Sequence, residues 1–345
     1  MLVALVSLGL LLQHAPRSGA WRCSAPVCEV SSLEIIVQRT ASGGLGIEVE
    51  PESNVVASNA GQPQLALGDL IVAVDGEECG KRYIGALLTP GADTYTFTVQ
   101  RGTARGREAL ETVGRRLCIE AADAATVPAI PLVGAGGMSE ELSERMLAIV
   151  DSLETSGPPT SLTADDLTGF WRLRFTNDKS LEGGMSGFGL IGGCTAVAQF
   201  QLYGQPELDS VQCVEVIANQ AMGAHQVAAL KGTFRAVSDE AQLVDLYTRI
   251  ELGGAPQSGS GKQEQKLMLT YMGDKLRIVR AGGENGAVRV YEKQSSDVAQ
   301  GDLQSLMTAP IVKEKVDENR PRWEIADEER RLSGGGPMTD ASSIP

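Results

Sequence analysis

Eight short segments in the second half of the chain alternate between apolar and polar residues. The clearest is Phe170–Thr176, which reads FWRLRFT. Successive side chains of a strand point to opposite faces, so a period of two is typical of a strand with one buried face. The other seven are Val197–Tyr203, Val211–Ile217, Val227–Ala236, Val244–Glu251, Lys266–Tyr271, Leu276–Val279 and Val288–Tyr291. Eight strands at this spacing predict an antiparallel barrel or sandwich. A barrel of about eight strands encloses packed side chains or one small ligand.

Shorter β-rich runs fill the first part of the chain. They are Leu33–Gln38, Leu45–Val49, Asn54–Ala57, Asp69–Val74 and Thr94–Gln100. A small helix is expected at Tyr83–Leu88, because Pro90 and Gly91 stop the apolar run there. Residues 32–103 are therefore predicted to form a small αβ domain.

The region between these two parts is expected to contain a linker and a pair of helices. Residues 104–137 are predicted as linker, with one helical turn around Leu110–Arg116. Ser139 is expected to cap a helix that runs to about Glu154, and Thr163 to cap a second one. The pair is interpreted as a lid or brace for a domain that spans 138–293. Residues 294–345 are charged and lack periodicity, which indicates a disordered tail.

The first 31 residues are expected to be a leader. Residues 2–12 read LVALVSLGLLL, which suits the apolar core of a signal peptide and is too short to cross a bilayer. Trp21 follows a small-residue cleavage site and opens a short stretch without acidic residues. This arrangement resembles the two-part leader of algae with secondary plastids. A buried N-terminal helix and simple secretion are the alternatives.

Composition narrows the possible functions. The chain has 30 Lys and Arg against 44 Asp and Glu, a net charge of −14, which disfavours nucleic-acid binding. Its two histidines are His14, in the expected leader, and His225, expected in a loop or in solvent. A histidine-based triad or metal site is therefore disfavoured, and the six cysteines contain no C-x-x-C pair. We expect a binding protein rather than an enzyme, with no metal or cofactor.

Residues 32–103 resemble a PDZ domain. The resemblance rests on Gly44–Ile47 (GLGI), Leu67–Ile71 (LGDLI), Val74–Gly76 (VDG) and the closing Val99–Arg101. It implies that the backbone N–H groups of Leu45, Gly46 and Ile47 bind the terminal carboxylate of a peptide added to the edge strand. Arg39 is expected to reinforce the carboxylate through water. The alternative is a PDZ-like fold with a vestigial groove.

Residues 139–291 resemble the plastid-lipid-associated (fibrillin) family. Two blocks carry the resemblance, Leu167–Asn177 (LTGFWRLRFTN) and Leu269–Arg280 (LTYMGDKLRIVR), with Val211–Asn219 as a plausible strand between them. The chain departs from the family at Ala287–Val290, where an aromatic-containing strand is usual. The resemblance implies a lipocalin-like barrel that binds plastid lipids, carotenoids, quinones or tocopherols at thylakoids or plastoglobules.

Gly169-x-Trp171 also resembles the opening signature of lipocalin-like barrels. Glycine allows the first strand to enter closely, and tryptophan plugs the closed end. A guanidinium from Arg277 or Arg280 is expected to stack on the indole, and Asp274 to hold one of those guanidiniums. These residues are interpreted as structural, without ligand contact. The glycine-rich segment 183–193 is expected to guard the barrel mouth, with a phosphate cradle as the weaker interpretation.

The expected whole is a mainly β, multidomain plastid protein: a PDZ-like domain, then a lipocalin-like antiparallel barrel preceded by a helix pair. Its barrel is expected to bind a neutral hydrophobic molecule or the surface of a lipid body, with peripheral membrane association, and its PDZ-like module to bind protein C-termini. Two alternatives stay open. One is a scaffold with a solid barrel, and the other is an enzyme on a lipocalin-type barrel that acts on a carotenoid or lipid.

Overall fold

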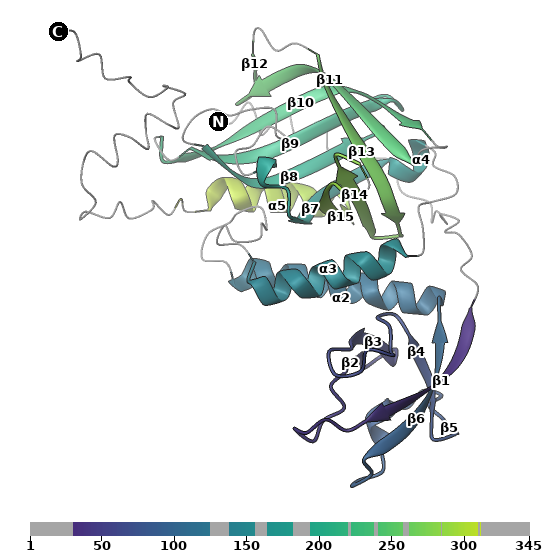
Figure 1. Ribbon diagram of the computed structural model, residues 1–345. Helices are drawn as coiled ribbons and strands as arrows, with labels where there is room; N and C mark the ends of the chain where they lie inside the picture. The colour runs from purple at the N-terminus through teal and green to yellow at the C-terminus, as the bar shows by residue number, and fades with distance from the viewer. Residues whose placement is uncertain are drawn as a thin grey trace, which may run out of the picture.

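A six-stranded antiparallel sheet opens the described part of the chain (Figure 1). The computed structural model describes residues 30–124, 138–155, 164–181, 194–219, 222–237, 241–257, 262–283, 285–309 and 311. The sheet comprises β1 (Ser31–Gln38), β2 (Glu48–Glu50), β3 (Val55–Ser58), β4 (Leu70–Val74), β5 (Glu77–Glu78) and β6 (Thr94–Arg101). The strands run in the order β1-β6-β4-β3-β2, and β5 pairs with β4. All but one of the expected N-terminal runs match its strands closely; in Leu45–Val49 only Glu48 and Val49 belong to a strand.

The small helix expected at Tyr83–Leu88 is a single 3-10 turn, η1 (Ile84–Ala86). Asn54 fixes this turn to the sheet: its Nδ2 donates to the Arg82 carbonyl at 2.7 Å, and the Ile84 amide donates to its Oδ1 at 3.1 Å. The helix is shorter than expected because Gly85, within the turn, weakens a helix and Pro90 follows closely.

A long helix, α2 (Ala104–Ala124), follows β6 almost at once. The expected linker with one helical turn is therefore wrong over these residues. The buried side chains of α2 recur every three or four residues and form one apolar stripe: Ala109, Leu110, Val113, Leu117 and Ala121. Charged residues and the glycines at positions 106 and 114 conceal this period in the sequence.

The second helix, α3 (Glu140–Glu154), begins where the sequence predicts. The Ser139 hydroxyl accepts a hydrogen bond from the Leu142 amide at 3.2 Å. Helices α2 and α3 lie between the N-terminal sheet and the barrel (Figure 1). They pack on the outer wall of the barrel through Phe175, Tyr271, Ile278 and Val290. The lid or brace role was expected of α3 and the helix after Thr163, and the position of α3 is that of a brace.

The second unit is a closed barrel of eight antiparallel strands. They are β7 (Gly169–Thr176), β8 (Cys194–Tyr203), β9 (Ser210–Asn219), β10 (Ala224–Val237), β11 (Gln242–Leu252), β13 (Gln263–Met272), β14 (Leu276–Ala281) and β15 (Ala287–Gln294). The ring closes because β15 pairs with β7 and β10 pairs with β11. Short elements flank it: α4 (Ala164–Leu167), η2 (Lys179–Leu181) and β12 (Ala255–Pro256). All eight predicted strands are confirmed.

Helix α5 (Ser296–Thr308) lies on the outside of the barrel, so the expectation of a disordered tail is wrong there. Leu303 packs against Val197, Phe200 and Val214 of the barrel wall. Asp302 pairs with Arg172 of β7. The expected leader up to residue 29, the glycine-rich segment 183–193 and Thr163 lie outside the described residues. Among the described helices, none combines the length and the hydropathy needed to span a bilayer.

Candidate functional site

The Gly-Leu-Gly-Ile turn, which is expected to bind a carboxylate, contains one position that requires glycine. Gly46 has φ +66°, and a Cβ there would lie 2.8 Å from the Gly61 Cα, so only glycine fits. The Gly61 amide donates to the Gly46 carbonyl at 2.8 Å and fixes the turn. Within the described chain, the amides of Leu45, Gly46 and Ile47 donate to no protein acceptor.

Arg39 holds this turn from the inside. Its Nε donates to the Ala92 carbonyl at 2.9 Å, its Nη1 to the Gly43 carbonyl at 2.7 Å and its Nη2 to the Tyr95 hydroxyl at 2.7 Å. All three guanidinium nitrogens thus have protein acceptors, and the side chain ties the turn to the start of β6. Its expected contact with a carboxylate through water stays a prediction.

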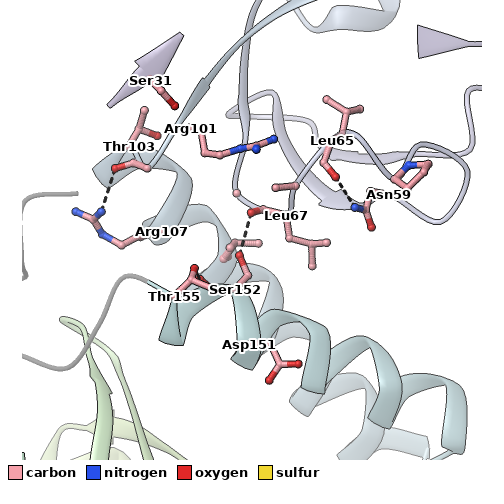
Figure 2. Close-up of a pocket in the computed structure, with 15 residues that line it drawn as sticks. Ser31, Asn59, Leu65, Leu67, Arg101, Thr103, Arg107, Asp151, Ser152 and Thr155 are labelled. Carbon is pink, nitrogen blue, oxygen red and sulfur yellow. Dashed lines mark hydrogen bonds between the residues drawn. The ribbon is translucent and has the colours of Figure 1, made fainter. Parts of the chain in front are cut away.

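A cleft of about 610 Å³ separates the N-terminal sheet from helices α2 and α3 (Figure 2). Its polar groups satisfy one another. Arg101 pairs with Asp69 at 2.7 Å, and the Ser152 hydroxyl donates to the Leu67 carbonyl at 2.9 Å. Arg101 and Asp69 both belong to the N-terminal unit, whereas the Ser152 hydrogen bond joins that unit to α3, so we interpret the cleft as a junction between units.

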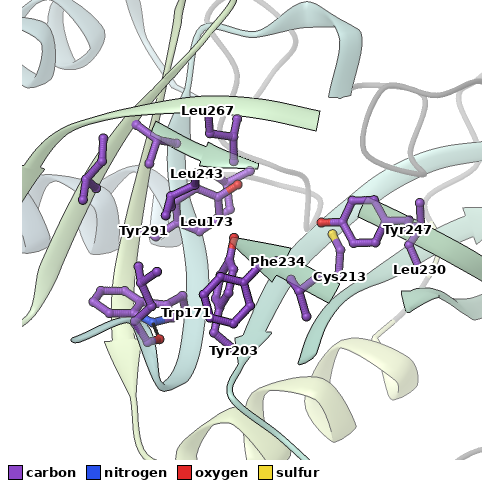
Figure 3. Packing of buried hydrophobic residues seen from close by; sticks show 14 of the residues in the cluster. Trp171, Leu173, Tyr203, Cys213, Leu230, Phe234, Leu243, Tyr247, Leu267 and Tyr291 are labelled. Atoms are coloured by element: carbon purple, nitrogen blue, oxygen red, sulfur yellow. Dashed lines mark hydrogen bonds between the residues drawn. The ribbon is translucent and has the colours of Figure 1, made fainter. Parts of the chain in front are cut away.

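The interior of the barrel is the strongest candidate site. Figure 3 shows aromatic and aliphatic side chains from many strands converging there. The apolar lining includes Leu173, Val211, Leu230, Phe234, Leu243, Leu267, Leu269 and Val279. Tyr203 and Phe234 meet edge to face, with ring centroids 4.9 Å apart.

Trp171 sits in this interior as the Gly-x-Trp signature predicts. The side chain is fully buried, and its Nε1 donates to the Leu167 carbonyl of α4 at 2.7 Å. The Arg277 guanidinium carbon lies 4.8 Å from the centre of the indole, and the Lys293 Nζ lies 5.2 Å from it. Gly169 has φ +127°, a region that favours glycine, and a Cβ there would lie 3.3 Å from the Lys293 Cε.

Arg277 is the most unusual residue of the barrel. It is fully buried, and its guanidinium carbon lies 5.0 Å from the Tyr203 ring and 4.6 Å from the Tyr291 ring, in addition to Trp171. Nη2 donates to Gln201 Oε1. Nε and Nη1 have no hydrogen-bond partner, and Arg277 forms no ion pair with a described acidic residue.

Asp274 and Arg280 do not take the roles expected of them. Asp274 is exposed in the turn between β13 and β14 and pairs with neither arginine within the described chain. Arg280 points out of the barrel, where its Nη2 pairs with Glu154 Oε2 of α3 at 2.6 Å. The reason is strand alternation: Arg277 and Arg280 are three residues apart on β14, so they face opposite sides.

The interior also contains acidic and amide groups that the sequence analysis did not identify. Asp245 is fully buried, and its Oδ2 accepts hydrogen bonds from Tyr203 at 2.9 Å and Tyr247 at 3.2 Å, whereas Oδ1 has no partner. Burial raises the pKa of Asp245 to about 6. Figure 3 shows the Tyr203 and Tyr247 rings on different sides of this interior.

A second series of hydrogen-bonded polar side chains crosses the barrel interior. The Tyr291 hydroxyl donates to Gln199 Oε1 at 2.8 Å, and Gln199 Nε2 donates to Glu215 at 3.0 Å. Arg289 pairs with Asp178 at 2.6 Å. The interior therefore combines an apolar lining with buried charged and amide groups. A signal was present in the sequence, because inward positions such as Gln199, Gln201 and Glu215 are polar within otherwise apolar strands.

Other candidate chemistries find little support in the described residues. His225 lies in β10 and is buried, which lowers its pKa, so the expectation of a loop or solvated histidine is wrong. No group of three or more metal-binding side chains occurs in the described part of the chain. Cys79, Cys118, Cys194 and Cys213 are buried, and no disulfide joins them to one another.

The sequence matches no protein-family model and no curated protein.

Proposed function

We propose that the barrel binds one lipophilic small molecule in its interior, and that the chain acts as a non-enzymatic lipid-associated protein of plastids. The observation that carries the proposal is Arg277. A fully buried guanidinium with two unpartnered nitrogens lies among apolar and aromatic side chains. Leaving a buried donor unpaired costs about 1–3 kcal/mol, and more for a charged group. A bound polar atom removes this cost, so the interior favours a ligand with a polar end.

The resemblance to fibrillins supports the choice of ligands. It suggests carotenoids, quinones, tocopherols or acyl lipids of thylakoids and plastoglobules. The leader expected over residues 1–31, whose last residue the structure places in β1, supports import into a plastid. The same proposal includes peripheral association with a lipid surface, because a lipophile has to be collected from one.

Uptake from a plastid lipid extract tests the proposal. The purified chain is incubated with the extract, separated from free lipid by gel filtration, and its bound molecules are identified by mass spectrometry. We expect one lipid class to be retained at close to one molecule per chain. A chain that elutes free of lipid, with no affinity for lipid vesicles, contradicts the proposal.

A matched pair of alanines locates the bound molecule. Ala196 belongs to the barrel interior, whereas Ala198 on the same strand packs outward with the residues that contact α5. Ala196→Phe should fill the interior and reduce retention severalfold, and Ala198→Phe should leave retention unchanged if the chain folds. Equal retention by both variants indicates that lipid binds outside the barrel.

A second function is proposed for the N-terminal unit, the binding of a protein C-terminus. The unpaired amides of Leu45, Gly46 and Ile47 support it, together with the half-buried Leu87 and Leu88 after η1. A peptide library screened with the full chain should enrich sequences whose binding needs a free carboxylate. Loss of binding on amidation is expected, whereas no enrichment supports a vestigial groove.

The two other interpretations predict different outcomes of the lipid experiment. A solid-barrel scaffold retains no lipid but binds peptides. An enzyme converts the retained molecule, and one observation favours it, since Asp245 and Glu215 both face the interior. The appearance of a chemically altered lipid with time would identify this activity.

A further inference from the structure

We propose that the molecule held in the barrel carries a carboxylate, which accepts hydrogen bonds from the free nitrogens of Arg277. This inference rests on the proposed function and narrows the ligand to a lipophilic monocarboxylic acid, an apolar chain or polyene with one anionic end. Arg277 was expected to be purely structural, but its Nε and Nη1 have no partner among the described residues, which gives the side chain a further role.

Arg277 places a permanent positive charge inside the barrel. Its guanidinium is always ionised, and removing an ionised group from water is costly without an opposite charge. A second buried guanidinium of the interior, that of Arg289, has such a partner in Asp178 at 2.6 Å. Within the described residues, the direct contacts of the Arg277 guanidinium are the neutral Gln201 oxygen and three aromatic rings, and Asp245 acts on it only at longer range. The rings cover the faces of the guanidinium, so its edges still need acceptors.

The surrounding groups favour an anionic oxygen at this place. Gln201 accepts from Arg277 through Oε1, which leaves its Nε2 as a further donor without a partner. Three nitrogens of two touching side chains therefore lack acceptors. A carboxylate is acceptor-only, with about four lone-pair sites on two oxygens, and matches this excess of donors. A neutral carbonyl would supply fewer acceptor sites and leave the charge uncompensated.

Asp245 does not take this place itself. The ring of Tyr203 lies 5.0 Å from the Arg277 guanidinium carbon, and the hydroxyl of the same tyrosine donates to Asp245 Oδ2 at 2.9 Å. The tyrosine thus stands between the two charges, and neither forms an ion pair with the other in the described chain. No acidic side chain of the described residues pairs with Arg277, so we assign the neutralising anion to the bound molecule.

A matched pair of probes tests the inference on the unmodified full chain. The fluorescence of cis-parinaric acid, a polyene fatty acid, rises on entering an apolar site, and its methyl ester has the same chain without the charge. A charge-assisted hydrogen bond is stronger than a neutral one, so the acid should bind about 10- to 100-fold more tightly than the ester. Equal affinities for acid and ester would overturn the inference.

Two arginines of β14 supply the variants. Arg277→Gln should lower the affinity for the acid by the same 10- to 100-fold and leave the ester unchanged. Arg280→Gln is the control, because Arg280 lies three residues away and pairs with Glu154 outside the barrel. If Arg277→Gln does not fold, the comparison of acid and ester on the unmodified chain decides alone.

The outcomes separate this inference from the proposed function. Tight binding of acid and ester alike, unaffected by Arg277→Gln, keeps the lipid-binding function and rejects the carboxylate; ordered water then completes the donors of Arg277. Failure of both probes and of all plastid lipids to bind rejects the function itself. A preference for the acid that persists in Arg277→Gln places the carboxylate elsewhere and overturns the assignment.

Discussion

At the scale of single residues, the barrel interior combines two buried charges of opposite sign that are not paired with each other. Arg277 is surrounded by aromatic rings, and Asp245 is held by two tyrosine hydroxyls. An interior without these charges would be more stable, so the two groups reduce the stability of the fold. Their presence indicates a purpose other than stability. This is the pattern expected where stability is sacrificed for binding.

Asp245 makes stability depend on pH in an unusual direction. Burial raises its pKa to about 6, whereas an aspartate of the unfolded chain titrates near 4. Between about pH 4 and 6 the folded state keeps a proton that the unfolded state releases, so this residue lowers stability as the pH rises. Asp245→Asn removes the effect. The variant should gain up to about 3 kcal/mol of unfolding free energy relative to the unmodified chain from pH 4 to pH 7.

Urea unfolding at a series of pH values measures this difference. Other carboxyl groups, including the buried Glu111, contribute equally to both proteins and cancel. Glu264→Gln on the exposed side of β13 is the control, and its difference from the unmodified chain should stay nearly flat. A flat difference for Asp245→Asn as well would show that Asp245 is ionised in the fold without cost.

The Trp171–Arg277 contact could be predicted from the sequence, and the place of Asp274 could not. Gly169-x-Trp171 marks the start of a barrel strand, and a cation on a late strand is the natural neighbour of its indole. Asp274 is close to both arginines in sequence, but it belongs to the turn after β13. Nearness in sequence does not fix the direction of a side chain in a turn, whereas alternation does so within a strand.

At the scale of elements, strands were predicted better than helices. Each barrel strand buries at least one face, so its period appears directly in the sequence. Helix α2 was missed because its contacts are made by residues far apart in the chain. Glu111 accepts a hydrogen bond from the Tyr271 hydroxyl at 2.6 Å, across 160 positions. A Cβ at Gly273 would lie 1.7 Å from Glu111 Oε1, so the close approach depends on that glycine.

Helix α5 was missed for a related reason. Ala299, Leu303, Leu306 and Met307 recur at helical spacing, but small and polar residues surround them. These residues are buried because the barrel wall beneath them is apolar on its outer as well as its inner face. In the sequence, such a wall appears only as strands that do not alternate cleanly. In β8 and β9 nearly every residue is buried, and this is the signature that indicates a covering helix.

At the scale of the whole molecule, α2 and α3 join the N-terminal unit to the barrel. Glu50 of β2 pairs with Arg116 of α2 at 3.0 Å, and Glu48 pairs with Arg145 of α3 at 2.7 Å. The strand expected to accept a peptide is therefore tied to the helices that brace the barrel. Exposed ion pairs are weak, about 0–1 kcal/mol each, so close packing must supply most of this connection.

Alanine substitutions at two glycines of α2 measure two effects separately: the intrinsic stability of the helix, and the packing of the N-terminal unit against it. Gly→Ala inside a helix adds about 1 kcal/mol of stability where space allows. A Cβ at Gly114 would meet its nearest neighbour, Met146 Cε, at 3.5 Å, an ordinary contact, so Gly114→Ala should stabilise by about this amount. A Cβ at Gly106 would lie 2.2 Å from the Gly68 carbonyl oxygen, which is backbone and cannot move alone. Gly106→Ala should therefore destabilise by about 1–3 kcal/mol despite the better helix former.

Hydrogen exchange shows where that loss occurs. In Gly106→Ala, amides of the loop around Gly68 and of β3 should exchange faster, because the N-terminal unit has to shift away from α2. Amides of the barrel strands should keep their protection, since their contacts with α2 begin further along the helix, at Leu110 and Glu111. Faster exchange throughout the barrel would mean that the two units unfold together, and a stabilised Gly106→Ala would mean that they are not in close contact.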